Sequence, residues 1–188
     1  MAGAQYDWYA FWSILDHSTD STTVKCYESN GNGGFTGGKY VRVSAVKAKH
    51  HNRSKNEMLG ETDFTFLSRQ EAIKAREYDI CVMKNLEQLD IPQQKIVRNG
   101  KTIWYNTSII PWINPDGIPL GVICIARDCT ERVEAQNRNK RLLKFLTRRI
   151  QTPLVAIMPF AKKLGSRQLT EKLHEMLLRV NRLLDAIK

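Results

Sequence analysis

The four cysteines of this sequence have the side chains best suited to metal binding or redox chemistry, and their spacing argues against a metal site. They are Cys26, Cys81, Cys124 and Cys129. None forms a Cys-x-x-Cys pair, and no histidine lies at metal-ligand spacing from any of them, so the pattern of a zinc site is missing. We therefore expect reduced thiols that fill space in a hydrophobic core.

Basic side chains are concentrated in one segment, where they could bind an anion or an acidic surface. The 188 residues carry a net charge of +10. Residues 1–130 hold 15 Lys and Arg against 14 Asp and Glu, whereas residues 131–168 hold ten against two. Such a segment attracts nucleic acid, anionic lipid or an acidic protein surface, and the alternative is a solvated helix face.

Length and composition indicate one folded domain with an appendage. Hydrophobic residues make up 42% and charged residues 26% of the chain, which is typical of a soluble globular protein. The longest apolar run near the last strand is far shorter than the roughly 20 residues that span a bilayer. The N-terminus lacks the pattern of a signal peptide, so we expect a cytoplasmic protein.

Hydrophobic periodicity and turn residues predict an α+β order of elements. Residues 1–20 have apolar residues at helical spacing, and residues 45–58 suggest short helical turns. The longest helix expected in the first domain covers residues 69–86. Strands are expected on both sides of a glycine-rich turn and of the Asn-Gly and Asn-Pro-Asp-Gly turns, over residues 22–28, 39–44, 92–98, 101–112 and 119–127.

Residues 20–132 resemble a PAS domain. The stretches that carry the resemblance are KYVRVSAVKAKHHNRSKNEMLGETDF, EAIKAREYD, GKTIWYNTSIIPW and NPDGIPLGVICIARDCTER. The resemblance implies the PAS fold, an antiparallel five-stranded sheet with short flanking helices. It also implies a sensory or interaction module and not an enzyme.

The end of this region is its most specific part. PAS domains that precede signalling helices commonly close with Asp-Ile-Thr-Glu-Arg, and Asp128, Thr130, Glu131 and Arg132 match, with Cys129 in place of Ile. Asp or Thr can cap the first N–H groups of a helix, and an acidic residue suits its positive end. We predict that Asp128, Thr130 and Arg132 couple the last strand to the helix; the alternative is a plain helix cap.

The following helix resembles the dimerisation and phosphotransfer helix of sensor histidine kinases. That helix carries His-Glu-Leu-Arg-Thr-Pro-Leu, and residues 151–154, QTPL, agree at three of the last four positions. The phospho-accepting His and the acid after it are replaced by Arg148 and Arg149. Because a guanidinium stays protonated, it is no nucleophile, and the resemblance implies a catalytically inactive hairpin. We expect Arg148 and Arg149 to dock an acidic partner surface.

An apolar stripe on this helix predicts association. Its members step by three or four residues and are Leu142, Leu146, Ile150, Leu154, Ile157, Ala161 and Leu164. Gly165 and Ser166 then break the helix, and a second stripe begins at Leu169. Because such a hairpin exposes too much apolar surface to stand alone, we expect two copies to form a four-helix bundle, a coiled-coil-like homodimer.

PAS domains can hold haem, flavin or a metabolite. The sequence argues against haem because the helix RQEAIKAREYDICVMKNL has no histidine, and against a flavin adduct because GETDFTFLS has no cysteine. An unidentified small ligand remains a candidate. The residues expected to line its cavity are Val43, Phe64, Phe66, Ile80, Met83, Trp104 and Cys124. The alternative is that they fill the core.

These observations predict an N-terminal helix (1–20), a PAS sensory domain (21–130) and a signalling helix with a hairpin (131–188) that no ATP-binding domain follows. We expect a homodimeric sensor that regulates a two-component system by pairing with a histidine kinase or docking a response regulator. One alternative is a PAS-containing transcription regulator that binds nucleic acid through residues 131–168, although no zinc-finger or helix-turn-helix pattern is present. Another is an inactive remnant of a larger kinase.

Overall fold

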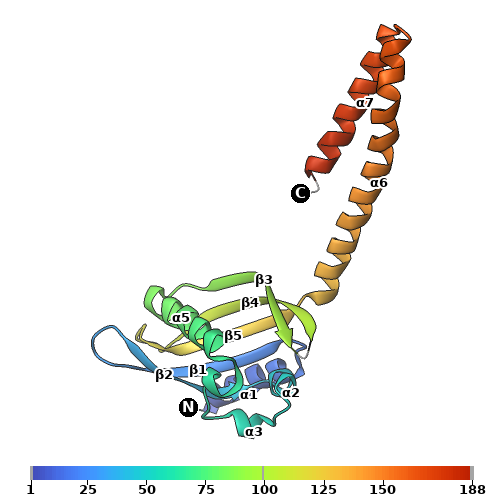
Figure 1. Ribbon diagram of the computed structural model, residues 1–188. Helices are drawn as coiled ribbons and strands as arrows, with labels where there is room; N and C mark the ends of the chain where they lie inside the picture. The colour runs from blue at the N-terminus through green and yellow to red at the C-terminus, as the bar shows by residue number, and fades with distance from the viewer. Residues whose placement is uncertain (1, 99, 187–188) are drawn as a thin grey trace. The chain divides into compact units, whose positions relative to one another are not determined.

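The computed structural model describes residues 2–98 and 100–186, which divide into two compact units, Met1–Thr130 and Glu131–Lys188. The first unit contains one five-stranded sheet of order β2-β1-β5-β4-β3, in which all neighbouring strands are antiparallel. The strands are β1 (Ser21–Ser29), β2 (Phe35–Val43), β3 (Leu89–Arg98), β4 (Lys101–Ile113) and β5 (Pro119–Asp128). The predicted α+β class and the sheet of five antiparallel strands are confirmed (Figure 1).

Four helices cover one face of this sheet, and the longest runs across it (Figure 1). They are α2 (Ala45–His50), α3 (Lys55–Met58), α4 (Asp63–Phe66) and α5 (Arg69–Asn85). Capping boxes start α3 and α5: the hydroxyls of Ser54 and Ser68 accept from the amides of Glu57 and Glu71, whose carboxylates accept in return. These caps fix where α5 begins, and therefore which of its side chains face the sheet.

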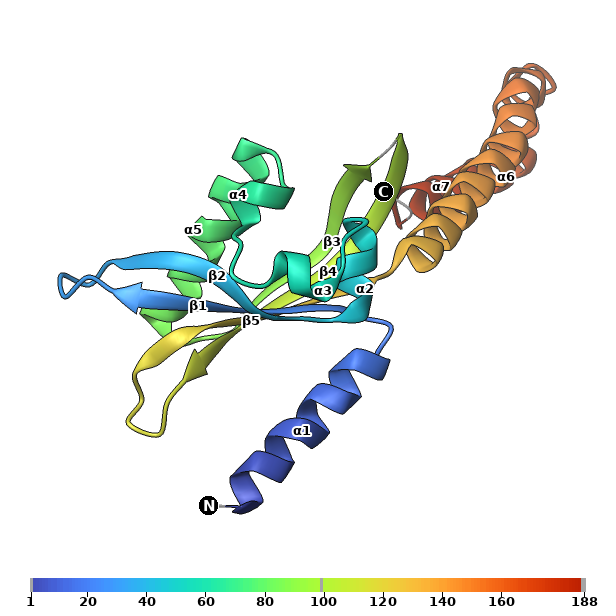
Figure 2. The ribbon, with the colours of Figure 1, turned by 90° about the horizontal axis from the view of Figure 1, so that it is seen from below.

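The N-terminal helix α1 (Ala2–His17) lies on the other side of the sheet from α2 to α5 (Figure 2). Asp16 forms an ion pair of 2.6 Å with Lys55, and the Arg42 guanidinium lies 5.8 Å from the centre of the Trp12 ring. No helix among the described residues is both long and apolar enough to cross a bilayer.

The apolar core of the first unit lies between the sheet and α5. Its buried members are Tyr27, Val82, Met83, Ile109 and Val122, and a second cluster joins Tyr40, Val43, Ala48 and Met58 under α2 and α3. On β5, Gly121 packs so tightly against β1 that a Cβ atom there would lie 1.9 Å from the carbonyl oxygen of Lys25. The register of β1 on β5 therefore depends on glycine at this position.

The second unit is a helical hairpin. Helix α6 (Thr130–Lys163) continues through Pro153 and Pro159, and α7 (Arg167–Ala186) returns alongside it. Gly165, at φ +66°, turns the chain between them, which agrees with the expected break. The buried contacts between the two helices involve Leu154, Ala161, Leu173 and Val180.

Candidate functional site: a polar cavity and the strand-to-helix junction

A cavity of about 460 Å³ lies between the sheet and helices α2, α4 and α5. All five helical lining residues of α5 lie on one face of that helix, at the spacing i, i+3, i+4, i+7 and i+8. The Lys, Asp and Glu residues of the lining are Lys25, Lys47, Asp63, Glu71, Lys74, Asp79 and Lys95. The cavity is therefore a polar site on the inner face of the sheet and not a gap in an apolar core.

A buried ion cluster forms part of this lining. Lys25 of β1 is 3% exposed, and its Nζ lies 2.8 Å from Oδ2 of Asp63 and also contacts Oδ2 of Asp79. Two phenols complete the cluster: Tyr40 donates to Oδ1 of Asp63 at 2.5 Å, and Tyr27 donates to Oδ2 of Asp79 at 2.7 Å. The five side chains of this ion cluster join β1, β2, α4 and α5.

Burial and mutual attraction shift the pKa values of the ion cluster in opposite directions. Burial alone would raise the pKa of Asp63, but the charge and hydrogen bond of Lys25 and the hydrogen bond of Tyr40 lower it overall. Burial raises the pKa of Asp79, which Lys25 and Tyr27 offset only in part. Burial would lower the pKa of Lys25, but Asp79 and Asp63 raise it well above its usual value. Lys25 is therefore a fixed cation and cannot act as a nucleophile.

The seven residues expected to line a ligand cavity lie at several places. Cys124 lines the polar cavity, and burial raises the pKa of its thiol. Ile80 and Met83 belong to the core around Tyr27, while Val43 and Phe66 belong to the cluster around Tyr40. Phe64 is 44% exposed, and Trp104 lies at the strand-to-helix junction described below. The structure therefore brings a different set of residues to this cavity.

The ion cluster was missed by the sequence analysis, although two signals point to it. Lys25 lies on the same face of a β-prone segment as Thr23 and Tyr27, both buried, and Asp79 lies at helical spacing from the buried Val82 and Met83 of α5. A charged residue on the inward side of an element needs a partner, since an isolated buried charge is costly. Sequence alone does not show that these two charges meet.

The strand-to-helix junction is held by hydrogen bonds around Trp104 of β4. Thr130, the first residue of α6, accepts from the amide of Trp104 through Oγ1 at 2.9 Å, and the amide of Cys129 donates to the Trp104 carbonyl at 2.8 Å. The carboxylate of Asp128 accepts from the amide of Thr130 at 2.8 Å. Asp128 and Thr130 thus tie the start of α6 to the sheet, while Arg132 is exposed.

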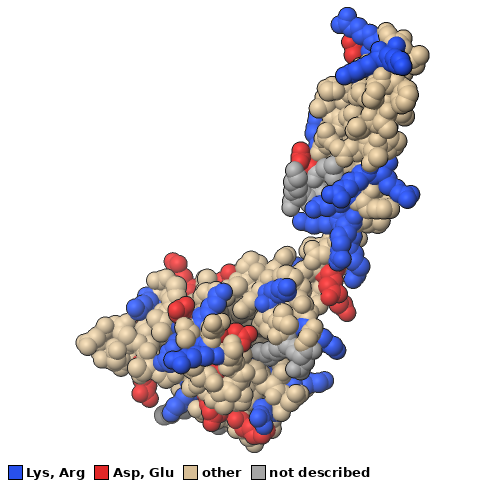
Figure 3. Space-filling view, in the orientation of Figure 1, with Lys and Arg blue, Asp and Glu red and all other residues tan. Residues whose placement is uncertain are grey.

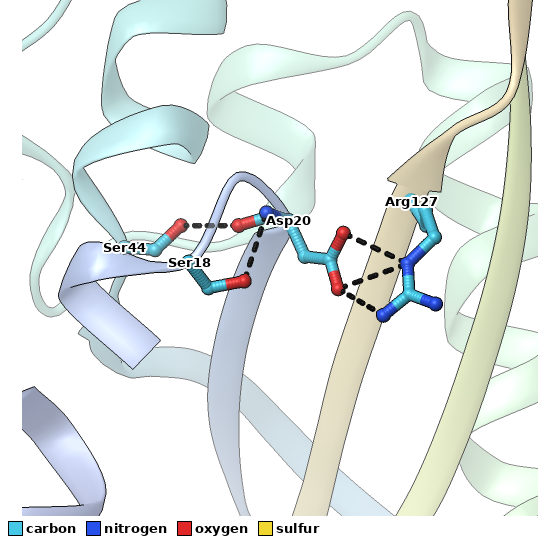
Figure 4. Close-up of polar contacts among 4 residues, drawn as sticks. All are labelled: Ser18, Asp20, Ser44 and Arg127. Carbon is cyan, nitrogen blue, oxygen red and sulfur yellow. Dashed lines mark hydrogen bonds and ion pairs between the residues drawn. The ribbon is translucent and has the colours of Figure 1, made fainter. Parts of the chain in front are cut away.

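A second network reaches the end of β5 from β1 and α2. Arg127 forms a bidentate contact with the carboxylate of Asp20, at 2.8 Å for its shortest hydrogen bond (Figure 4). The Asp20 carbonyl accepts from the hydroxyl of Ser44, which also caps α2. Asp20 therefore connects Ser44, the cap of α2, to Arg127 near the end of β5.

Seven of the ten basic residues in residues 131–168 lie on α6 between Arg132 and Arg149, and Figure 3 shows Lys and Arg side chains gathered over the lower part of the hairpin. Arg148 and Arg149 are both exposed, and the Arg149 guanidinium lies 5.1 Å from the centre of the Phe145 ring. His50 is exposed and borders the polar cavity. The described residues contain no group of His, Cys, Asp and Glu suited to a metal ion.

Comparison with known proteins identifies the family. A sequence model described as the PAS fold matches residues 36–134, more than half of the chain. The chain belongs to this PAS family. No curated protein is detectably similar to it in sequence. The hairpin's likeness to histidine kinases, by contrast, rests on the sequence motif alone.

Solved structures with the same fold have low sequence identity to this PAS chain. A PAS domain from Colwellia psychrerythraea is 14% identical, with 65% of this chain and 97% of that chain covered and a TM-score of 0.50. The Vibrio cholerae VqmA dimer, a LuxR-type receptor with a target DNA, is 15% identical over 65% of this chain and 53% of its own, with a TM-score of 0.52. A Rhodobacter sphaeroides LOV protein is 11% identical over 97% of this chain and 96% of its own, with a TM-score of 0.51. This PAS chain thus spans about half of the Vibrio protein.

Proposed function

We propose that this PAS protein is a homodimeric sensor whose output is the pairing of its α6–α7 hairpin with that of a second copy. The PAS unit would sense a signal in its polar cavity, and the junction at Thr130 would pass the change to α6. In this proposal the hairpin is catalytically inactive, because Arg148 stands where a kinase has its phospho-accepting histidine. It would regulate a two-component system by pairing with a histidine kinase or docking a response regulator.

The observation that carries the proposal is a second apolar seam on each helix, separate from the buried contacts between them. Ile150 and Ile157 of α6 and Leu164 just after its end are exposed at intervals of seven residues, and on α7 the same holds for Leu169, Met176 and Leu183. A seven-residue repeat is the spacing that packs helices into coiled coils and four-helix bundles. Two hairpins that met along these seams would bury both sets.

Arg141 and Arg148 lie on the opposite side of α6 from this seam. At 100° per residue, they lie about 160° to 180° from Ile150 and Ile157, and Arg149 lies about 80° to 100° from them. A dimer formed through the seam would therefore leave this basic side accessible. An acidic protein surface is one partner that it could bind, and we propose that Arg148 and Arg149 dock a response regulator there.

The junction explains how a change in the PAS unit could reach the hairpin. Thr130 belongs to α6 but accepts from the amide of Trp104, so a shift of β4 or β5 changes where α6 starts. A ligand shifts such an equilibrium only by its difference in affinity for the two arrangements. The proposed mechanism is thus a change of helix packing between two copies.

The test compares two variants of α6 by light scattering. Ile157 and Val155 are 48% and 53% exposed, and both can be changed to Glu, but their directions differ by about 160°. We expect Ile157→Glu to raise the dimer dissociation constant about a hundredfold, because each dimer would bury two carboxylates. Val155→Glu, outside the seam, should leave the dimer intact. Equal effects of the two changes, or none, would refute the seam.

A second candidate function is regulation of transcription through DNA binding. The observation that favours it is the excess of ten basic over two acidic residues in residues 131–168. Contacts with phosphates would make binding fall steeply with salt. Titration of duplex DNA at two salt concentrations tests this candidate: loss of binding in Lys144→Glu supports it, and no binding at low salt excludes it.

A further inference from the structure

The polar cavity has the size and composition of a small-molecule site. Its volume of about 460 Å³ falls within the range of roughly 300–1,000 Å³ that such sites occupy. Apolar side chains, among them Leu67, Ile91 and Ile109, share its walls with the ion cluster. This mixture fits an organic molecule that has an apolar body and a few polar groups.

One acceptor in the ion cluster lacks a donor. Asp63 accepts hydrogen bonds through both carboxylate oxygens, from Lys25 and from Tyr40. Asp79 is 1% exposed, and its Oδ2 accepts from Tyr27 and contacts Lys25, but its Oδ1 is buried and accepts no hydrogen bond from the described residues. An unsatisfied buried acceptor is costly, so a bound molecule that donates to this oxygen gains affinity.

The donor that fits this position is a hydroxyl. The Nζ of Lys25 contacts the other oxygen of the same carboxylate, so an ammonium group at Oδ1 would lie close to a second fixed cation. Like charges at such short distance in a buried site repel strongly. A neutral O–H group makes the hydrogen bond without this repulsion.

The rest of the lining favours a negative charge on the ligand. Beyond the ion cluster, the charged lining residues described are Lys47, Lys74, Lys95 and Glu71. The carboxylate of Glu71 already accepts from the amide and hydroxyl of Ser68 at the start of α5. The Lys74 ammonium lies 5.7 Å from the ring centre of Tyr78, which also lines the cavity. With the ion cluster included, the lining holds four lysines against three carboxylates, a balance of +1 that favours an anionic ligand.

We propose that the cavity binds a small hydroxycarboxylate, with its carboxylate facing Lys47 and Lys74 and its hydroxyl donating to Asp79. The apolar body would pack between Leu67 and Ile109. This inference rests on the sensory role proposed above, because it names the chemical class that the PAS unit senses. The bound anion bridges α2 and α5, and α2 is connected through Ser44 and Asp20 to β5.

The test titrates the full chain with three probes of one size while its amide NMR signals are recorded. The probes are 2-hydroxy-4-methylpentanoate, 4-methylpentanoate without the hydroxyl, and 2-hydroxy-4-methylpentanamide without the charge. We expect the hydroxycarboxylate to shift signals of the cavity residues and to bind about fivefold or more tighter than either analogue, the difference expected for one charge-assisted hydrogen bond. Equal binding of the three probes, or no shift with any of them at millimolar concentration, would overturn the proposal.

A matched pair of variants on α5 separates the site from general charge effects. Lys74 lines the cavity, whereas Lys84 is an exposed lysine of the same helix outside the lining. Lys74→Met should weaken hydroxycarboxylate binding about fivefold and leave amide binding unchanged, while Lys84→Met changes neither. Equal losses in both variants would contradict the site. A failure of this ligand test would not bear on the proposed dimer, because pairing through the apolar seam is tested separately by light scattering of the Ile157→Glu variant.

Discussion

Replacement of Lys25 by Met tests the role of the ion cluster in the stability of the PAS unit. The change keeps a side chain of similar length but removes the ammonium group that contacts both Asp63 and Asp79. Removal of one member of a buried ion pair costs about 3–5 kcal/mol, because the remaining charge stays buried without compensation. Domains are stable by only about 5–15 kcal/mol, so the loss is a large fraction of the total.

The assay is urea unfolding at pH 7, followed by tryptophan fluorescence. We expect the free energy of unfolding of Lys25→Met to fall by about 3–5 kcal/mol. Lys39→Met is the matched control, since Lys39 is an exposed lysine on the neighbouring strand, opposite Cys26, and should change stability by about 0.5 kcal/mol or less. A loss below about 1 kcal/mol in Lys25→Met would contradict the stabilising role of Lys25, because it would mean that the two buried carboxylates do not need this cation.

The pH dependence of the same variant gives a second check. In the native protein the pKa of Asp63 is lowered, so its stabilisation is present above its unfolded pKa and is lost as the pH falls through its folded pKa. Without Lys25, burial raises the pKa of both carboxyls, and the variant regains stability as they become protonated. The deficit of Lys25→Met should therefore shrink between pH 7 and pH 4. A deficit that is constant over this range would contradict the cluster's electrostatics.

Two further predictions concern alkaline unfolding and the junction. Burial and the neighbouring carboxylates raise the pKa values of Tyr27 and Tyr40, and the carboxylates raise that of Lys25 despite its burial, so the folded state holds protons that the unfolded chain releases. Stability in urea should fall above about pH 10 by about 1.4 kcal/mol per pH unit for each group, and a flat profile to pH 11 would contradict this. Thr130→Val leaves the Trp104 amide without its acceptor, so hydrogen exchange of this amide should accelerate, whereas Thr130→Ser should keep it protected. Equal exchange in the two variants would exclude this hydrogen bond as the contact that holds the junction.

The order of elements was predictable from the sequence because local signals agree with the fold. Alternation of apolar residues and the Asn-Gly turn mark β3 and β4, and Ser68 with Glu71 marks the start of α5. The ends of the elements were less predictable. Strand β2 begins at Phe35, four residues before the expected strand, because its pairing with β1 extends through Gly37 and Gly38. Strand pairing is a tertiary effect that local propensity does not contain.

The cavity was less predictable because charges from separate elements form it. Asp63 and Asp79 lie 38 and 54 residues from Lys25 in the sequence, so nothing in the local sequence shows that these charges meet. The expected lining was chosen from apolar residues, yet Ile80 and Met83 pack in the core around Tyr27 instead. By contrast, the contact of the Asp128 carboxylate with the Thr130 amide is local and agrees with a carboxylate at the start of a helix, whereas the contact of Thr130 with Trp104 spans 26 residues and has no local signal.

Pairing of two copies of this PAS protein through the α6–α7 hairpin is tested by light scattering of the intact chain beside a chain that ends at Arg132. We expect a mass of about twice 21.6 kDa for the intact chain and the mass of a single chain for the shortened protein. A monomeric intact chain would contradict the claim, and so would a dimer that persists without the hairpin, which would place the contact on α1 or the sheet.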